Sequence, residues 1–133
     1  MNYFEPHLTP DELRAISAIG LAHMGDAVYE TLVRTWLCVH GKATGKELHR
    51  ATIALVCAQK QAELAQQVLP QLTEEELAVY KRGRNANVHA MPRSATPAQY
   101  HAATGLECLM GWLYLQGNKE RAEQLFHAMM EEE

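Results

Sequence analysis

The sequence has few cysteines, no long hydrophobic run and no strand-like alternation. Three cysteines among 133 residues, odd in number and far apart, exclude a complete disulfide framework. Cys38, Cys57 and Cys108 each have apolar neighbours, so all three are expected to be buried free thiols. No apolar run approaches the roughly 18 residues that cross a bilayer, and the first residues do not resemble a signal peptide. The chain is therefore expected in the cytoplasm, without membrane contact.

Length and composition indicate one domain. A chain of 133 residues, 47% of them hydrophobic, is long enough to bury a core and too short for two ordinary domains. We therefore expect a single domain over residues 1–133.

Acidic residues are missing from one long segment of this otherwise acidic chain. The net charge is −4, yet Leu77 to Leu106 contains no acid and carries four bases, Lys81, Arg82, Arg84 and Arg93. Such a segment favours a polyanionic partner in spite of the sign of the whole protein. A solvated basic loop without any partner fits these charges equally well.

The helix signals are frequent and clear. Capping-box patterns with a helical start occur at Thr9, Thr44, Thr73 and Thr96. The first should open a helix that carries Leu13, Ile16 and Ile19. A second apolar pattern, from Leu21 to Leu37, predicts a long helix that stops before Gly41. With no strand pattern elsewhere, the fold class is predicted to be all-α.

The remaining segments add helices and one irregular connection. Helical sequence runs from Thr44 to Pro70, with a break expected near residues 50–52. Shorter helices are expected after Thr73 and over residues 119–130, and a long one after Thr96. Residues 86–95 lack periodicity and are read as a loop, of a length that is often functional in compact domains.

Two carboxylates lie alone in apolar helical sequence. Asp26 is the only charged residue between Ala15 and Tyr29, and Glu107 is the only one in residues 102–115. Burying both would be costly unless each pairs with a cationic side chain or both share a divalent cation. Neighbouring Gly25 and Gly111 indicate a close approach of backbones at these positions.

These residues carry a family resemblance. The segment MGDAVYE resembles the L-G-D-A-V signature of ribonuclease III nuclease domains, and LECLMGWLYL resembles their second signature, F-E-A-L-I-G-A-x-Y-L. Together with VCAQKQAELA and the acid run before KRGRNA, they are similar to the compact Mini-ribonuclease III subgroup, which lacks a double-stranded RNA-binding domain. The resemblance extends from about Leu21 to Phe126.

The resemblance implies a fold and a chemistry. The fold would be the helical endonuclease domain of ribonuclease III. Asp26 and Glu107 match the two acids that bind Mg²⁺, which Mn²⁺ can replace, and that activate water for attack on a phosphodiester. The implied activity is endonucleolytic cleavage of double-stranded RNA by a homodimer, leaving 5′-phosphate ends. The implied substrate is precursor 23S ribosomal RNA, and a ribosomal protein is left open as a further partner.

The sequence also departs from the larger enzymes. Further acids of full-length ribonuclease III fall here on Ile19, Ala22 and Thr104, so a four-carboxylate site does not transfer. Glu30, one helical turn after Asp26, and His23, three residues before it, are candidates for the outer shell of the site.

RNA would have to be held by the domain's own surface. Lys81, Arg82, Arg84, Asn85 and Arg93 are the expected RNA contacts. Two other functions remain open: a catalytically inactive helical RNA-binding or ribosome-assembly protein, and a purely structural helical dimer.

Overall fold

A computed structural model describes residues 1–86 and 94–131 of the chain. This part of the chain contains helices and no β-strand, which confirms the all-α prediction. Among the described helices, none combines the length and the apolar character that a membrane crossing requires. In chain order the elements are α1 (Pro10–Arg14), α2 (Ala18–Val39), α3 (Gly45–Val56), α4 (Ala58–Val68), the 3₁₀ helix η1 (Leu69–Gln71), α5 (Glu74–Arg84), α6 (Pro97–Leu115) and α7 (Lys119–Met129).

The helix starts follow the predicted capping residues. Full capping boxes are present at Thr9, Thr73 and Thr96, where each hydroxyl accepts from the N–H three residues on and that residue's side chain reciprocates. At Thr44 the structure gives the hydroxyl half of the box, with the Glu47 N–H donating at 3.2 Å. Capping therefore explains where these four helices begin.

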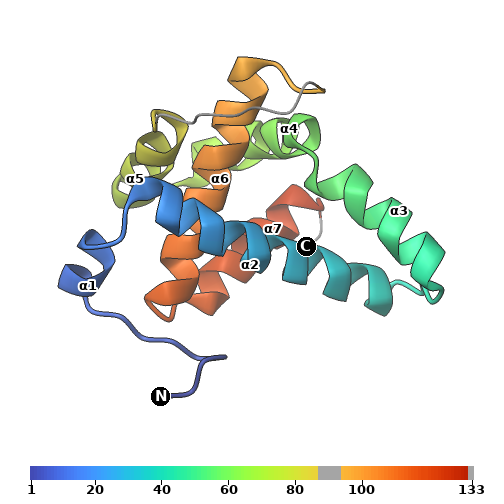
Figure 1. Cartoon of the computed structure of the whole chain (residues 1–133), viewed down its shortest axis with the longest axis horizontal. Coiled ribbons are helices and arrows are strands. Elements are labelled where there is room, and N and C mark those ends of the chain that lie inside the picture. The colour runs from blue at the N-terminus through green and yellow to red at the C-terminus, as the bar shows by residue number, and fades with distance from the viewer. Residues whose placement is uncertain (87–93, 132–133) are drawn as a thin grey trace.

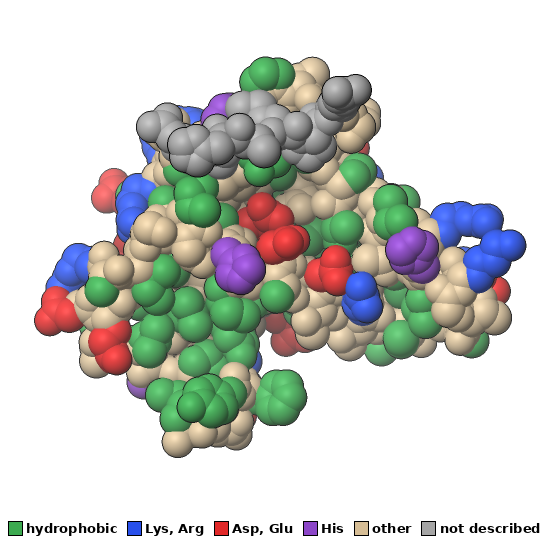
Figure 2. Space-filling view, viewed as in Figure 1, with side chains coloured by type: hydrophobic (Ala, Val, Ile, Leu, Met, Phe, Trp, Pro, Cys, Tyr) green, Lys and Arg blue, Asp and Glu red, His purple; other side chains and the backbone are tan. Residues whose placement is uncertain are grey.

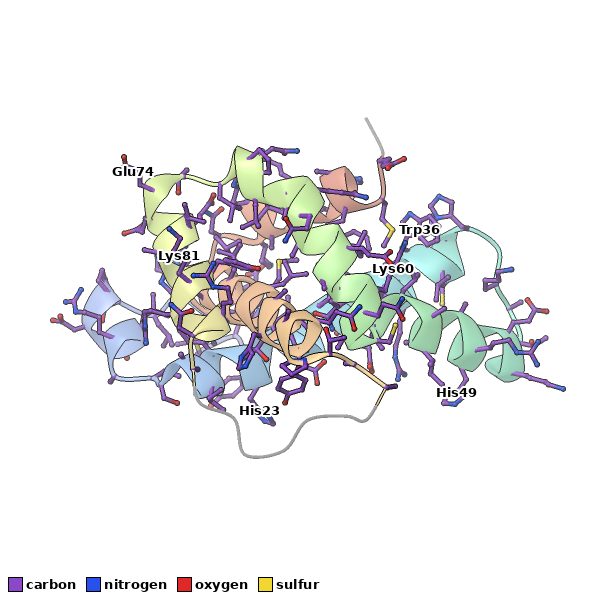
Figure 3. The ribbon with its side chains drawn as sticks, turned by 90° about the horizontal axis from the view of Figure 1, so that it is seen from above. His23, Trp36, His49, Lys60, Glu74 and Lys81 are labelled. Carbon is purple, nitrogen blue, oxygen red and sulfur yellow. The ribbon has the colours of Figure 1, made fainter. Side chains whose placement is uncertain are left out.

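Helix α6 is the centre of the fold. It lies between α5 and α4, and α2 crosses it (Figures 1 and 3). Ten of its residues are buried, on all sides of the helix, as expected for a helix with neighbours all round. The main core joins α6 to α2, α4 and α7, and a smaller core lies under α1. Glu107 is therefore placed on the most enclosed helix of the molecule.

Glycines allow α2 and α6 to touch. A β-carbon built on Gly25 would overlap the carbonyl oxygen of Glu107, and one on Gly111 would overlap the carbonyl oxygen of Leu21. Any larger residue at either position would force the two helices apart. The close approach predicted from Gly25 and Gly111 is thus confirmed.

Two boundary predictions were wrong. The first helix ends at Arg14, and Ile19 belongs to α2, because the Ser17 side chain accepts from the Gly20 N–H and starts a new helix. The break between α3 and α4 lies at Cys57, whose backbone is extended, and not at residues 50–52.

The prediction that all three cysteines are buried was wrong for two of them. Only Cys108 is buried, on the central helix, whereas Cys38 and Cys57 are exposed. These two thiols lie at helix ends, where a side chain escapes the core more easily, and Val39 beside Cys38 is exposed as well. All three thiols are free, as expected.

Candidate metal centre

Asp26 and Glu107 meet where α2 crosses α6. Asp26 follows Gly25 in α2, and Glu107 lies in the middle of α6, so the glycine contact brings the two side chains together. The two carboxyl groups lie close enough for Asp26 to act on the pKa of Glu107. Asp26 is exposed and Glu107 is partly buried, so the cost of burying two carboxylates together does not arise. The site has one enclosed ligand and one that faces solvent.

The electrostatics of Glu107 reflect this placement. Burial, followed by the negative charge of Asp26, raises the pKa of Glu107 to about 8. A hydrogen bond donated by Gln61 Nε2 to Glu107 Oε2, at 3.4 Å, acts in the opposite direction. No salt bridge to a described Lys or Arg neutralises either acid. Of the two ways of compensating the buried charge, pairing with a cationic side chain is absent from the described residues.

Both acids open into one cavity. It has a volume of about 460 Å³, and its walls come from α2, the end of α3, the start of α4, residues 94–95 and α6. Besides the two acids its lining includes Cys57, Gln61, Tyr100 and Thr104. Figure 2 shows acidic side chains near the middle of this face of the molecule. The cavity is large enough for a hydrated ion and part of a ligand.

The donor set suits a hard divalent cation. Mg²⁺ is typically held by one or two carboxylates and keeps several waters, and Asp26 and Glu107 supply two carboxylates beside open space. Within residues 1–86 and 94–131, no three His, Cys, Asp or Glu side chains gather in a way that could hold a metal. A cation here would therefore rest on these two acids and on water. Two of the positions that correspond to further acids of full-length ribonuclease III have different surroundings here. Thr104 lines the cavity, whereas Ala22 is buried in the smaller core.

The two outer-shell candidates lie apart from the cavity lining. Glu30 forms a salt bridge with Arg34 at 2.8 Å, one turn further along α2. His23 is exposed, and Figure 3 shows it at the outer edge of the molecule. Neither residue lines the cavity, so their proposed outer-shell roles stay predictions.

The expected RNA contacts group at the end of α5. Lys81, Arg82 and Arg84 are exposed in its last turn, and Asn85 caps its C-terminus. Arg84 lies over the Tyr80 ring at 6.0 Å and donates to Asn85 Oδ1 at 3.2 Å. Arg93 lies outside the described residues. The structure therefore places four of the five predicted contacts on one short surface.

Sequence reasoning missed Gln61. Its side chain is 2% exposed and reaches from α4 to Glu107, yet it sits in a segment that contains several glutamines. A signal was present, because Gln61 occurs at helical spacing with Leu64, Ala65 and Val68, which form the buried face of α4. A polar residue on that face was the clue.

The sequence profile of the ribonuclease III domain matches residues 20–118, which include both acids and the whole α2–α6 crossing. The chain belongs to the ribonuclease III family. Membership of this family supports an endoribonuclease activity.

Individual relatives narrow the family. The chain is 45% identical over 108 residues to Mini-ribonuclease 3 of Symbiobacterium thermophilum, covering 81% of this chain and 83% of the relative. It is 42% identical over 118 residues to Mini-ribonuclease 3 of Enterococcus faecalis, covering 87% and 89%. These relatives confirm the resemblance to the Mini-ribonuclease III group of the ribonuclease III family.

A solved structure agrees with the fold. The crystal structure of a protein from Fusobacterium nucleatum superposes with a TM-score of 0.81 at 30% identity. The match covers 89% of this chain and 96% of that one. The helical arrangement around α6 is therefore that of an experimentally observed protein.

Proposed function

We propose that this chain is a divalent-metal-dependent endoribonuclease that cleaves double-stranded RNA. The observation that carries the proposal is the meeting of Asp26 and Glu107 in one open cavity without a cationic side chain between them in the described structure. Two anionic groups placed there would repel a phosphodiester, so they suit RNA only together with a cation. Mg²⁺ is the expected ion, and Mn²⁺ should replace it.

The site residues would divide the work in a simple way. In-line hydrolysis adds negative charge to a phosphodiester that is already anionic, and a divalent cation at Asp26 and Glu107 supplies charge that offsets it. Glu107, partly buried on α6, would hold the cation from the inner side of the cavity. Asp26 is exposed and would hold it from the side on which the RNA approaches. Products with 5′-phosphate ends are the expected outcome.

RNA binding is assigned to the basic end of α5. Lys81, Arg82 and Arg84 would contact phosphates, with Asn85 beside them and Arg93 further along the chain. A-form RNA is recognised mainly through its phosphates, its 2′-hydroxyl groups and its shape, so weak sequence preference is expected from this surface alone.

The biological setting follows from the subgroup. Precursor 23S ribosomal RNA in the cytoplasm is the proposed substrate, with a ribosomal protein as an optional partner. A homodimer is the proposed assembly. It is supported by an apolar groove lined by Met24, Ala27 and Val28 of α2 and by Tyr114 of α6.

One experiment separates the nuclease from an inactive RNA-binding protein. The purified protein, its Asp26→Asn and Glu107→Gln variants, and a Glu120→Gln control with an exposed acid on α7 are incubated with long double-stranded RNA and Mg²⁺. Wild type and the control should cut the RNA into fragments, and EDTA should abolish this cleavage. The cleavage rate of both site variants should be lower by at least about 100-fold. If wild type binds RNA without cutting it, the nuclease proposal fails and the RNA-binding alternative stands.

A further inference from the structure

Gln61 is a buried amide at the wall of the candidate metal centre. It lies in the first turns of α4, just after the extended residue Cys57, and is 2% exposed. Helix α4 packs against α6, so that the Gln61 side chain reaches Glu107. It is one of four buried polar or charged side chains in the described structure, with Thr52, Glu76 and Thr104.

Both hydrogens of the amide have acceptors. Nε2 donates to the Val56 carbonyl oxygen at 2.8 Å and to Glu107 Oε2 at 3.4 Å. A backbone carbonyl only accepts, so the nitrogen must face Val56 and the orientation of the amide is fixed by chemistry. The amide is therefore a bridge from the end of α3 to the carboxylate on α6.

The other end of the amide is unsatisfied. Gln61 Oε1 is buried and has no hydrogen-bond partner within the described structure. By contrast, the Glu76 carboxylate accepts from Arg121 and from the Thr73 N–H, and Thr104 donates to the Tyr100 carbonyl oxygen at 2.9 Å. An orphaned buried acceptor destabilises a protein, so an apolar side chain of similar length would suit the core better. The cost of this amide points to a role at the site and not in the core.

We propose that Gln61 is a positioning residue, which holds the Glu107 carboxylate in the orientation that binds the divalent cation. The inference rests on the metal-dependent function proposed above. Glu107 Oε2 accepts a hydrogen bond from the α4 side, which restricts the rotation of the carboxylate relative to Asp26. Replacing a group that orients a metal ligand in this way typically weakens metal affinity by about 10- to 100-fold.

The hydrogen bond from Gln61 matters more because the candidate site has only two carboxylate ligands in the described chain. No third His, Cys, Asp or Glu joins Asp26 and Glu107 in the described chain, so a cation depends on the geometry of two carboxylates. A Glu107 side chain free to rotate would present its oxygens to the cation only part of the time. The hydrogen bond from Gln61 limits that rotation without adding a charge.

The test measures cation binding and not cleavage. Mn²⁺ dissociation constants are obtained from the electron paramagnetic resonance signal of free Mn²⁺ for wild type, Gln61→Met and Gln67→Met. Gln67→Met is the matched control, an exposed glutamine on the same helix. Gln61→Met should bind Mn²⁺ about tenfold more weakly, and Gln67→Met should bind it as wild type does. If Gln61→Met does not fold, Mn²⁺ binding is measured on Gln61→Leu instead.

The outcomes are distinct. If the folded Gln61→Met or Gln61→Leu variant binds Mn²⁺ as tightly as wild type, the inference is overturned, whatever happens to its stability, because Gln61 then only joins α3 to α4. If wild type itself fails to bind Mn²⁺, or Asp26→Asn binds it equally well, the proposed metal-dependent function fails instead.

Discussion

Gly25 and Glu107 meet backbone to backbone, with no room for a β-carbon between α2 and the Glu107 carbonyl oxygen. This contact sets the separation of the two helices that carry the candidate ligands. Because Asp26 is the next residue after Gly25, the position of its carboxylate depends directly on the glycine.

Replacing Gly25 by alanine should therefore damage both the fold and the site. The new methyl group would push α2 away from α6 and lower the free energy of unfolding by about 1–3 kcal/mol or more. Urea unfolding and Mn²⁺ binding would measure the two effects. Gly45→Ala is the control, since a β-carbon there meets nothing within 4 Å. Equal stability of Gly25→Ala and Gly45→Ala would contradict the contact.

Glu107 should make the stability of the metal-free protein depend on pH. Its pKa is about 8 in the folded chain and 4.5 as the ordinary value, so the unfolded chain binds fewer protons between these limits. Stability should therefore fall as pH rises from about 5 to about 8. In EDTA, the stability of Glu107→Gln relative to wild type should increase over this range. A constant difference would argue against the buried, acid-facing environment of Glu107.

The ion pair between Glu76 and Arg121 should make stability fall in acid, in contrast to Glu107, whose effect is a loss of stability at higher pH. Arg121 donates from Nε and Nη2 to the two Glu76 oxygens at 2.8 and 2.9 Å, which lowers the pKa of Glu76 below its ordinary value. Its stabilisation is present above pH 4.5 and is lost as pH falls through the lowered pKa. Glu76→Gln should cost about 2 kcal/mol at pH 7, and the cost should shrink in acid. Chemical unfolding at pH 7 and pH 3.5 tests this, with exposed Glu123→Gln as the control that changes little.

The basic end of α5 should dominate RNA affinity. Arg82→Ala combined with Arg84→Ala removes two exposed cations from its last turn. The affinity for double-stranded RNA should fall, and the slope of log affinity against log salt should become shallower by about 2. Filter binding at several salt concentrations measures both. Arg14→Ala, which removes an exposed arginine paired with Asp11 on α1, should leave the slope unchanged. An unaltered slope in the double variant would remove this surface from the mechanism.

The apolar groove along α2 should control assembly. Ala27 is exposed and lines this groove, so Ala27→Arg would place a charge in the proposed homodimer contact. Sedimentation should then show a monomer at concentrations where wild type is dimeric. Ala78→Arg, an equivalent change at an exposed position of α5, should remain dimeric. A wild-type protein that is monomeric at all concentrations would refute the assembly.

Local signals predicted most of the helices and the central crossing. Threonine N-caps predict the starts of α1, α3, α5 and α6, because their hydrogen bonds involve only residues three positions further along the chain. The break at Cys57 was missed because no glycine or proline marks it. Its extended backbone ends α3 and starts α4, and both the Tyr29 hydroxyl and the Gln61 amide bond to carbonyls just before it. Tyr29 is far from Cys57 in the sequence, and the position of Gln61 depends on how α4 packs. Neither contact can be predicted from the residues next to Cys57.

The candidate site was only half visible in the sequence. Asp26 and Glu107 could be named because charges in apolar helices are conspicuous, but Gln61 carries no charge and resembles its exposed neighbours Gln59 and Gln67. Only the packing of α4 on α6 distinguishes them. The unequal exposure of Asp26 and Glu107 likewise depends on which helix lies at the centre.

The crossing of α2 and α6 also couples cation binding to folding. Residues 26 and 107 come together only when the two helices pack, so an unfolded chain offers no paired site. A cation that binds there acts as a ligand of the native state alone. At a concentration 100 times its dissociation constant it would stabilise the fold by about 2.7 kcal/mol. The ionic content of the cell would then help to decide how much of the protein is folded, as well as how fast it works.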